Sequence, residues 1–370
     1  MTAGHTPHEG RAHPRDVRLC FLGFGNVARA LCTLLAAQAH VLGSRHGLRV
    51  VITAAGTRHG SLLAPEGLAP AEVLATIGDG PPPQAARPAG ELLASSAADV
   101  LVELTEMGDL SGLATGTRRR GGGPAPVPAA TGHILDAFRL GMDVVTANKA
   151  PIAWSWPQIS AAAAAAGRRI RFESTVMDGL PVFSLLEFAL PDCALLGVEA
   201  VFNGTTNFII DALGSGRTLD DALGEMQAAG LAEADPANDL DGWDAASKAA
   251  ALANVAMGAD ITPLDVERVS LRDVAAERIA EARGRGRRVR LVTSIRRDPA
   301  PAPVGGPVRA GMRAEELDID HPLAAVGGDS LGALLHTDLM ADVLVCERRA
   351  YVPQTAYGVY ADLLHLCRTS

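Results

Sequence analysis

The sequence has little of several features that mark particular classes of protein. It has five cysteines without a CxxC pair or zinc-ligand spacing, at Cys20, Cys32, Cys193, Cys346 and Cys367. We therefore expect buried single thiols in a reducing compartment. Basic residues number 33 against 42 acidic ones, which gives a net charge of −9. That balance argues against a nucleic-acid partner, which a broad basic surface would attract.

Long apolar runs are also missing. No run reaches the ~18 residues of a membrane span without charges or helix breakers, so we expect no membrane partner. Residues 1–16 contain three histidines but lack the apolar core of a secretion signal. Nothing around those histidines is patterned to hold a metal, so we expect a disordered tail and a cytoplasmic protein.

What the chain has is enough length and apolar content for two domains. It has 370 residues, of which 48% are hydrophobic. In residues 17–171, expected strands alternate with helices, which predicts an α/β, Rossmann-type domain with a parallel sheet. The expected strands lie at 17–22, 48–56, 98–105, 142–149 and 168–175. One helix among loops is expected in 61–95.

The segment 115–130 interrupts this alternation with Gly, Pro and Arg. It is either a solvated loop or a mobile basic flap over the phosphates of a cofactor. From residue 172 to 350 the pattern changes to that of an α+β domain. Strong helices are expected at 218–230, ending at Gly230, and at 243–257, with a linker at 297–311 between two strands. We expect residues 351–370 to form a helix that returns to the first domain.

The stretch FLGFGNVARAL contains a GxGxxA pattern between an expected strand and an expected helix. Gly23 allows a tight turn, Gly25 lets the backbone approach a pyrophosphate, and Ala28 allows close packing of the helix on the strand. The helix N-terminus then offers N–H groups to the phosphates. The candidate cofactor-binding residues are Gly23, Phe24, Gly25, Asn26, Val27, Arg58, Thr105, Asn148 and Lys149.

The end of the second strand indicates which nicotinamide cofactor is bound. An NAD-selective site favours an acid there, but this strand continues into Thr57, Arg58 and His59. Arg58 can pair with a 2′-phosphate. We therefore expect NADP, with NAD as the alternative.

An acidic stretch, EADPANDLDGWDAASK at 233–248, precedes a nearly all-apolar helical run. Asp244 and Lys248 are four residues apart on the expected helix and so share a face. They form either an exposed ion pair or the charged edge of a cleft. The apolar run AAALANVAM after Lys248 favours the cleft, because such a helix is buried on most sides.

Five blocks in order resemble the homoserine dehydrogenase family: GFGNVA, GMDVVTANKAPIA, FESTVMDGLPV, FNGTTNFI and the acidic stretch. The resemblance spans about residues 17–265. It implies oxidation of L-homoserine to L-aspartate 4-semialdehyde, or the reverse, with NAD(P), and a homodimer. An acidic pocket with lysines suits a zwitterionic amino acid.

The resemblance also implies roles for individual residues. Lys149 and Lys248 face the reacting centre, and Lys248 assists proton transfer, for which it would need a lowered pKa. The substrate-binding residues are Glu233, Asp239, Asp244, Gly204 and Thr205. Backbone carbonyls of Glu173 and Val176 could hold a monovalent cation.

Two departures from the family pattern leave alternatives open. Met177 and Asp178 are bulkier than the small residues typical of that turn, which puts the cation in doubt. The segment before the last helix lacks a glycine cluster. A relative acting on another small amino-hydroxy acid or amino-aldehyde is therefore the alternative enzyme, and a cofactor-binding sensor without turnover is an alternative of another class. No threonine feedback through an appended domain is expected.

Overall fold

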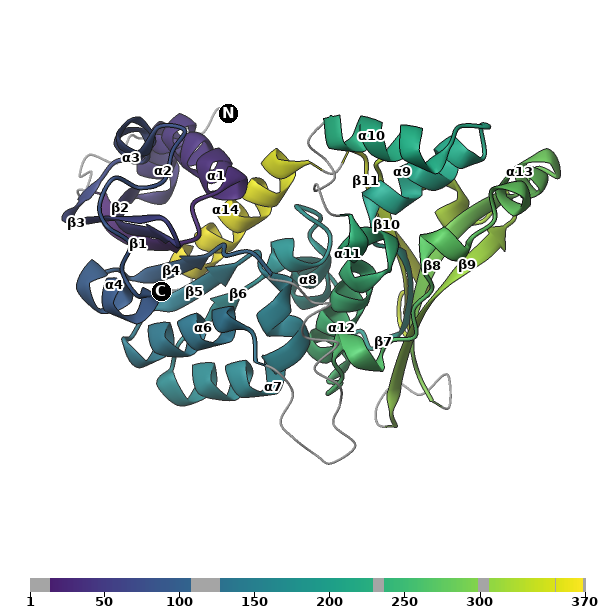
Figure 1. Ribbon diagram of the computed structural model, residues 1–370. Coiled ribbons are helices and arrows are strands. Elements are labelled where there is room, and N and C mark those ends of the chain that lie inside the picture. Colours follow the sequence, from purple (N-terminus) through teal and green to yellow (C-terminus); the bar gives the residue numbers. More distant parts are fainter. Residues whose placement is uncertain (1–13, 108–126, 229–235, 299–305, 350, 369–370) are drawn as a thin grey trace, which may run out of the picture.

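The computed structural model describes residues 14–107, 127–228, 236–298, 306–349 and 351–368. The chain forms two sheets, each with its own helices (Figure 1). The strands of the first sheet lie in the order β3-β2-β1-β4-β5-β6, and all neighbours are parallel except β2 and β3. They are β1 (Arg15–Leu22), β2 (Leu48–Thr57), β3 (Gly60–Leu68), β4 (Val100–Glu103), β5 (Asp143–Thr146) and β6 (Ile170–Arg171).

Separate apolar cores cover the two faces of this sheet. The helices around it are α1 (Asn26–Ala37), α2 (Ala39–His46), α3 (Pro70–Ile77), α4 (Ala89–Ser96), α6 (Ala129–Arg139) and α7 (Lys149–Ala166). The last helix, α14 (Val352–Arg368), lies against α1 (Figure 1). Its Val359 and Leu363 share one core with Val17 and Leu31 of the first sheet and α1.

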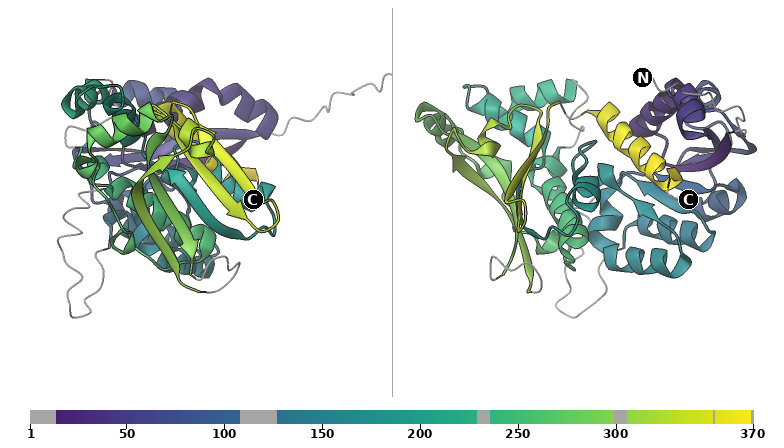
Figure 2. Two further views of the ribbon diagram at one scale, coloured as in Figure 1. Left: turned by 90° about the vertical axis from the view of Figure 1, so that its right-hand side faces the viewer. Right: turned by 180° about the vertical axis from the view of Figure 1, so that it is seen from behind.

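The second sheet is antiparallel throughout, in the order β11-β10-β7-β8-β9. Its strands are β7 (Leu195–Val201), β8 (Arg288–Arg297), β9 (Val308–Leu317), β10 (Leu331–Thr337) and β11 (Asp342–Glu347). Helices cover the face toward the first sheet. The opposite face is covered where Leu323, Ala324 and Val326 pack with Val201 and Val292, and otherwise lies open in the left view of Figure 2. The helices are α8 (Val182–Ser184), α9 (Gly204–Leu213), α10 (Leu219–Ala228), α11 (Ala237–Leu240), α12 (Trp243–Met257) and α13 (Ala276–Gly284). A parallel sheet with helices on both sides beside an antiparallel sheet confirms the predicted fold class.

Several local expectations were wrong. Segment 61–95 forms strand β3 as well as helices α3 and α4. Pro65 and Gly67 made β3 hard to predict, because both residues are uncommon inside strands. An edge strand tolerates them, since its outer side forms no hydrogen bonds with another strand. Arg15 and Asp16, expected in the tail, belong to β1, where Arg15 pairs with Leu48 of β2.

The strand expected at 168–175 is also shorter than predicted. Only Ile170–Arg171 pairs with β5, and residues 173–175 form a 3-10 turn. The backbone N–H of Glu173 donates to Asp362 of α14 at 2.8 Å, which draws the chain away from the sheet.

The cysteines are only partly as expected. All five are free, and Cys20 and Cys32 are buried, but Cys346 is exposed. Burial raises the pKa of the Cys20 and Cys32 thiols to about 12, so both are unreactive.

Four features of the sequence analysis lie outside the described residues. They are the histidine-containing tail at 1–13, most of the 115–130 segment, Gly230 and Glu233. Within the described ranges, no single helix has both the length and the apolar composition needed to cross a bilayer; one bent pair, α1 with α2, meets those two criteria.

Candidate active site

A cavity of about 370 Å³ lies where the helices of the second sheet meet the first sheet and α14. Six of the predicted site residues line it: Lys149, Gly204, Thr205, Asp239, Asp244 and Lys248. They come from α7, α9, α11 and α12, which are far apart in the sequence. The packing of α7 against α12 in one apolar core brings the two lysines together.

Asp244 is the centre of the charged cluster. Its Oδ1 lies 2.8 Å from Lys149 Nζ, and its Oδ2 lies 3.1 Å from Lys248 Nζ. Asn203 Nδ2 also donates to Oδ2, at 2.9 Å. Burial alone would raise the pKa of Asp244, but the two ammonium groups and Asn203 outweigh it and lower that pKa. Asp244 is therefore an ionised partner shared by both lysines.

The two lysines differ in their further contacts. Lys248 Nζ also donates to the Phe202 carbonyl at 2.7 Å, which fixes it at the end of β7. Burial opposes the charged form of Lys149, but Asp244, Asp239 and Asp178 outweigh it and raise the pKa of Lys149. Lys149 is therefore held as an ammonium.

These two are the only lysines in the chain, since 31 of its 33 basic residues are arginine. An arginine cannot release its proton in a protein, whereas a lysine can. The two lysines, Lys149 and Lys248, both line the cavity, so the chain has lysine instead of arginine at the two basic positions of the site. The restriction of lysine to positions 149 and 248 is visible in the sequence, but the sequence analysis missed it.

Asp239 has a different environment. Asn203 Nδ2 donates to its Oδ1 at 2.7 Å. Burial, and then repulsion from Asp244, raise the pKa of Asp239 to about 6. Asp239 is therefore ionised at neutral pH but close to its titration range.

Asn203 was also missed by the sequence analysis. Its Oδ1 accepts the backbone N–H of Thr206 at 2.8 Å and so caps α9. Its amide nitrogen donates to both Asp239 and Asp244 and so lies between the two carboxylates. An asparagine directly before a helical run is the usual capping signal, so the motif FNGTTN could have identified it.

The predicted nucleotide turn lies between β1 and α1. Gly23 has a φ of +89°, and a Cβ there would lie 2.2 Å from the Leu104 carbonyl oxygen. A Cβ on Gly25 would meet nothing within 4 Å, and α1 begins there without a side-chain cap. The open space beside uncapped helical N–H groups fits a pyrophosphate. Phe24 is buried, whereas Asn26 and Val27 begin the helix.

Thr105 and Asn148 link this turn to the cavity. Asn148 Nδ2 donates to the Thr105 carbonyl at 3.1 Å, and Asn148 Oδ1 caps α7 by accepting the Ala150 N–H. Since Lys149 follows Asn148, the segment beside Gly23 also positions a lysine of the cavity.

Arg58 lies in the turn between β2 and β3 with its side chain 74% exposed. Its Nη1 is 3.6 Å from Oε2 of Glu106, which follows β4. No acid directly follows β2 in the sequence, where Arg58 and His59 stand, but the fold brings Glu106 beside Arg58.

Glu173 and Val176, the predicted cation ligands, are both buried. The Glu173 carboxylate accepts the backbone N–H groups of Phe183 and Ser184 at 2.7 and 2.8 Å. That carboxylate therefore holds the start of α8.

Comparison with known proteins agrees with this architecture. The sequence profile of the family described as homoserine dehydrogenase matches residues 181–364. The NAD(+)-dependent homoserine dehydrogenase of Pseudomonas canavaninivorans is 30% identical over 355 residues, covering 95% of this chain and 96% of that protein. The chain belongs to the homoserine dehydrogenase family.

Solved structures of the homoserine dehydrogenase family have the same fold. The structure of a putative homoserine dehydrogenase from Archaeoglobus fulgidus aligns with a TM-score of 0.79 at 25% identity, over 95% of this chain and 99% of that one. A hyperthermophilic archaeal homoserine dehydrogenase in complex with NADPH aligns with a TM-score of 0.74 at 26% identity, over 96% and 99%. Both solved structures therefore agree with the family assignment and share the architecture of this chain.

Proposed function

We propose that the cavity binds L-homoserine and that the chain interconverts it with L-aspartate 4-semialdehyde. The observation that carries this proposal is the sharing of Asp244 by Lys149 and Lys248 within one cavity. A bound nicotinamide would exchange a hydride with the substrate carbon. Gly23, Gly25 and the start of α1 would hold its pyrophosphate, with Phe24, Asn26, Val27, Thr105, Asn148 and Lys149 around it.

Lys248 moves the proton in this proposal. In the reductive direction its Nζ donates a proton to the carbonyl oxygen, and in the oxidative direction it takes the hydroxyl proton, directly or through a water. Lys149 stays charged and stabilises negative charge near the reacting oxygen or the substrate carboxylate. Asp244 orients both lysines rather than meeting the substrate's ammonium, because Lys149, Lys248 and Asn203 already engage its oxygens.

The substrate's ends are assigned by charge. Gly204 and Thr205 at the start of α9 suit the carboxylate, since a helix N-terminus favours an anion. Asp239 suits the ammonium, together with Glu233, which lies outside the described residues.

Turnover assays with charge-preserving variants test these roles. Purified protein is offered L-homoserine with NADP and then NAD, and the absorbance of the reduced cofactor is followed. Lys248→Arg keeps the charge but cannot release a proton, so we expect turnover to fall by about 100-fold or more with cofactor affinity unchanged. If Lys248→Arg retains turnover, the proton-transfer role is wrong. If the wild type oxidises only another amino-hydroxy acid, the alternative substrate class is correct.

We propose NADP as the preferred cofactor, with Arg58 pairing with its 2′-phosphate. Arg58→Ala should lower the NADP-to-NAD selectivity by about tenfold. Glu106→Gln is the matched variant, because it frees Arg58 from its ion pair and should raise that selectivity. An unchanged ratio in both variants would remove Arg58 from the site.

A monovalent cation at the backbone carbonyls of Glu173 and Val176 is a separate proposal. The Glu173 side chain already holds α8, so the carbonyls are the atoms left for an ion. Turnover measured in potassium, sodium and choline chloride at equal ionic strength tests it, and equal rates in all three would contradict it.

We further propose a homodimer formed through the open face of the second sheet. Leu344 points outward from β11 and is 45% exposed, while its neighbours Val343 and Val345 pack on the helix-covered core. Two such faces can stack as in a β-sandwich. Light scattering of the wild type should give twice the mass of the monomer, and Leu344→Arg should give the mass of a single monomer. A monomeric wild type contradicts the proposal.

A further inference from the structure

Asp329 is a cavity residue to which the sequence analysis assigned no role. It precedes β10, and its backbone touches the start of α9: a Cβ on Gly204 would lie 3.2 Å from the Asp329 carbonyl oxygen. Its Oδ2 accepts the hydroxyl of Tyr351, which lies just before α14. Asp329 thus faces the cavity beside the two residues proposed to bind the substrate carboxylate.

Two of the other three cavity acids, Asp239 and Asp244, are more heavily engaged, and the third, Asp178, accepts the Thr355 hydroxyl at 3.1 Å. Both oxygens of Asp244 contact lysines, and Asp239 accepts the Asn203 amide and has a pKa of about 6. In the described part of the chain, the Asp329 carboxylate has one hydrogen-bond partner, the Tyr351 hydroxyl. Since a carboxylate can accept several hydrogen bonds, Asp329 has acceptor capacity left for a ligand.

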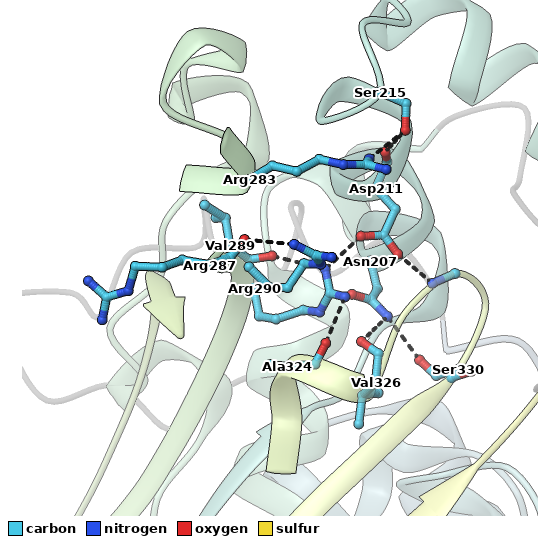
Figure 3. Close-up of polar contacts among 12 residues, drawn as sticks. Asn207, Asp211, Ser215, Arg283, Arg287, Val289, Arg290, Ala324, Val326 and Ser330 are labelled. Atoms are coloured by element: carbon cyan, nitrogen blue, oxygen red, sulfur yellow. Dashed lines mark hydrogen bonds and ion pairs between the residues drawn. The ribbon is translucent and has the colours of Figure 1, made fainter. Parts of the chain in front are cut away.

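An ion pair between a buried arginine and a half-buried aspartate holds the loop that carries Asp329 (Figure 3). Arg290 on β8 has a side chain only 3% exposed, and its Nη1 lies 2.7 Å from Oδ1 of Asp211 on α9. Arg290 Nη2 donates to the Ala324 carbonyl at 3.2 Å. Asp211 Oδ2 accepts the backbone N–H of Gly328 at 2.8 Å. The pair therefore fixes the chain one residue before Asp329.

The same loop is fixed again by Asn207, one helical turn before Asp211 on α9. Asn207 Nδ2 donates to the carbonyls of Val326 and Ser330 at 3.0 and 3.3 Å (Figure 3). Gly327 leaves room for the ion pair, because a Cβ there would lie 2.8 Å from Asp211 Oδ2. The loop 326–330 is thus docked on α9 on both sides of Asp329.

We propose that Asp329 selects substrates that carry an ammonium group next to the carboxylate, and that the Arg290–Asp211 pair positions it. This inference rests on the proposed function. The ammonium of an α-amino acid is bonded to the carbon beside the carboxylate, so a carboxylate bound at the start of α9 brings it toward Asp329. A charge-assisted hydrogen bond there distinguishes homoserine from the same molecule without its amino group.

Asp329→Asn tests the selection. With 4-hydroxybutanoate as a competitive inhibitor that lacks the amino group, the KM for L-homoserine should rise about tenfold or more while the inhibition constant changes less than twofold. The kcat and the KM for the cofactor should stay near wild type, because the reacting atoms are not touched. Equal increases for both ligands would overturn the proposal, since Asp329 would then only shape the cavity.

Tyr351→Phe separates binding from tethering. It removes the hydroxyl that Asp329 accepts but keeps the carboxylate, so we expect a smaller increase in the homoserine KM than in Asp329→Asn. If Tyr351→Phe raises the homoserine KM as much as Asp329→Asn does, or more, and raises the inhibition constant of 4-hydroxybutanoate in parallel, the function of Asp329 is its hydrogen bond to Tyr351. That result would overturn the proposed selection.

Asp211→Asn tests the positioning role. It should raise the homoserine KM several-fold with the inhibition constant unchanged, because the loop loses the charge that docks Arg290 and Gly328. The control is Asp16→Asn, since the Asp16 side chain is 35% exposed, close to the 36% of Asp211, and pairs with Arg49 at 2.6 Å far from the cavity. A selective effect in Asp211→Asn alone supports the proposal, and the same effect in the control overturns it.

The proposed function can fail separately from this inference. A wild type that does not turn over L-homoserine contradicts the proposed function. A wild type that does, and whose Asp329→Asn variant keeps its discrimination against 4-hydroxybutanoate, contradicts only the inference.

Discussion

Lys149 and Asp244 meet at 2.8 Å between Nζ and Oδ1, across the contact between α7 and α12. Burial disfavours an unpaired ion, so Lys149 on α7 depends on Asp244, which is also paired with Lys248 of its own helix. The pair therefore joins the two halves of the molecule and prepares the cavity for a charged substrate.

The Lys149–Asp244 pair makes the first prediction. In Asp244→Asn the pKa of Lys149 should fall, since burial remains while its strongest partner loses its charge. The chain has two lysines, so isotope-labelled lysine gives two side-chain NMR signals that can be titrated directly. Turnover should fall by about tenfold or more as both lysines lose their orientation. A Lys149 pKa that is unchanged in Asp244→Asn would contradict the assignment.

Asp239 predicts the acid limb of the pH profile. Its pKa is raised to about 6, so it is ionised above that pH and becomes neutral as the pH falls through it. A neutral Asp239 attracts an ammonium less, so kcat/KM for L-homoserine should fall below about pH 6. Asp239→Asn should remove this limb and give a low, flat profile there. A limb at the same pH in the variant would assign it to another group.

The nucleotide turn gives two glycine variants that should differ in their effect on stability. A methyl group on Gly25 meets no protein atom within 4 Å, so Gly25→Ala should fold normally but weaken cofactor binding. Gly23→Ala would place Cβ 2.2 Å from the Leu104 carbonyl at a positive φ, so it should also lower the free energy of unfolding by about 1–3 kcal/mol. Thermal unfolding and cofactor titration separate the two effects. Undiminished cofactor affinity in Gly25→Ala would exclude it from the pyrophosphate site.

Asp362 makes a prediction about stability. Burial raises its pKa well above 3.8, so the folded state holds this proton at pH values where the unfolded chain releases it. The sign follows: stability falls as pH rises above about 3.8, up to the folded-state pKa. Asp362→Asn removes that loss and keeps an oxygen for the Glu173 N–H, so its stability relative to wild type should increase with pH.

Urea unfolding of wild type and Asp362→Asn from pH 4 to 8 measures this difference. Asp192→Asn is the control, because Asp192 is exposed and its left-handed φ of 60° suits asparagine. A difference between Asp362→Asn and wild type that does not change with pH would contradict the prediction.

Much of the fold followed from local patterns. The strand–GxGxxA–helix order predicted β1, the Gly23 turn and α1, because glycine conformations and helix starts depend on neighbouring residues. The apolar run after Lys248 predicted a buried α12, because that segment consists mostly of strong helix formers such as alanine and leucine. Edge strand β3 was missed because Pro65 and Gly67 interrupt the usual strand pattern. A strand tolerates these residues there because β3 lies at the edge of the sheet.

The sequence by itself determined the nucleotide turn, the helix carrying Asp244 and Lys248, and the family resemblance, since each depends on residues close together in the chain. Only the tertiary structure decided that Lys149 and Lys248 share Asp244, that Asn203 separates it from Asp239, and that Asp329 enters the cavity on a loop held by Arg290 and Asp211. These contacts join separate helices and strands, and the packing of apolar faces, rather than any local spacing, sets their distances.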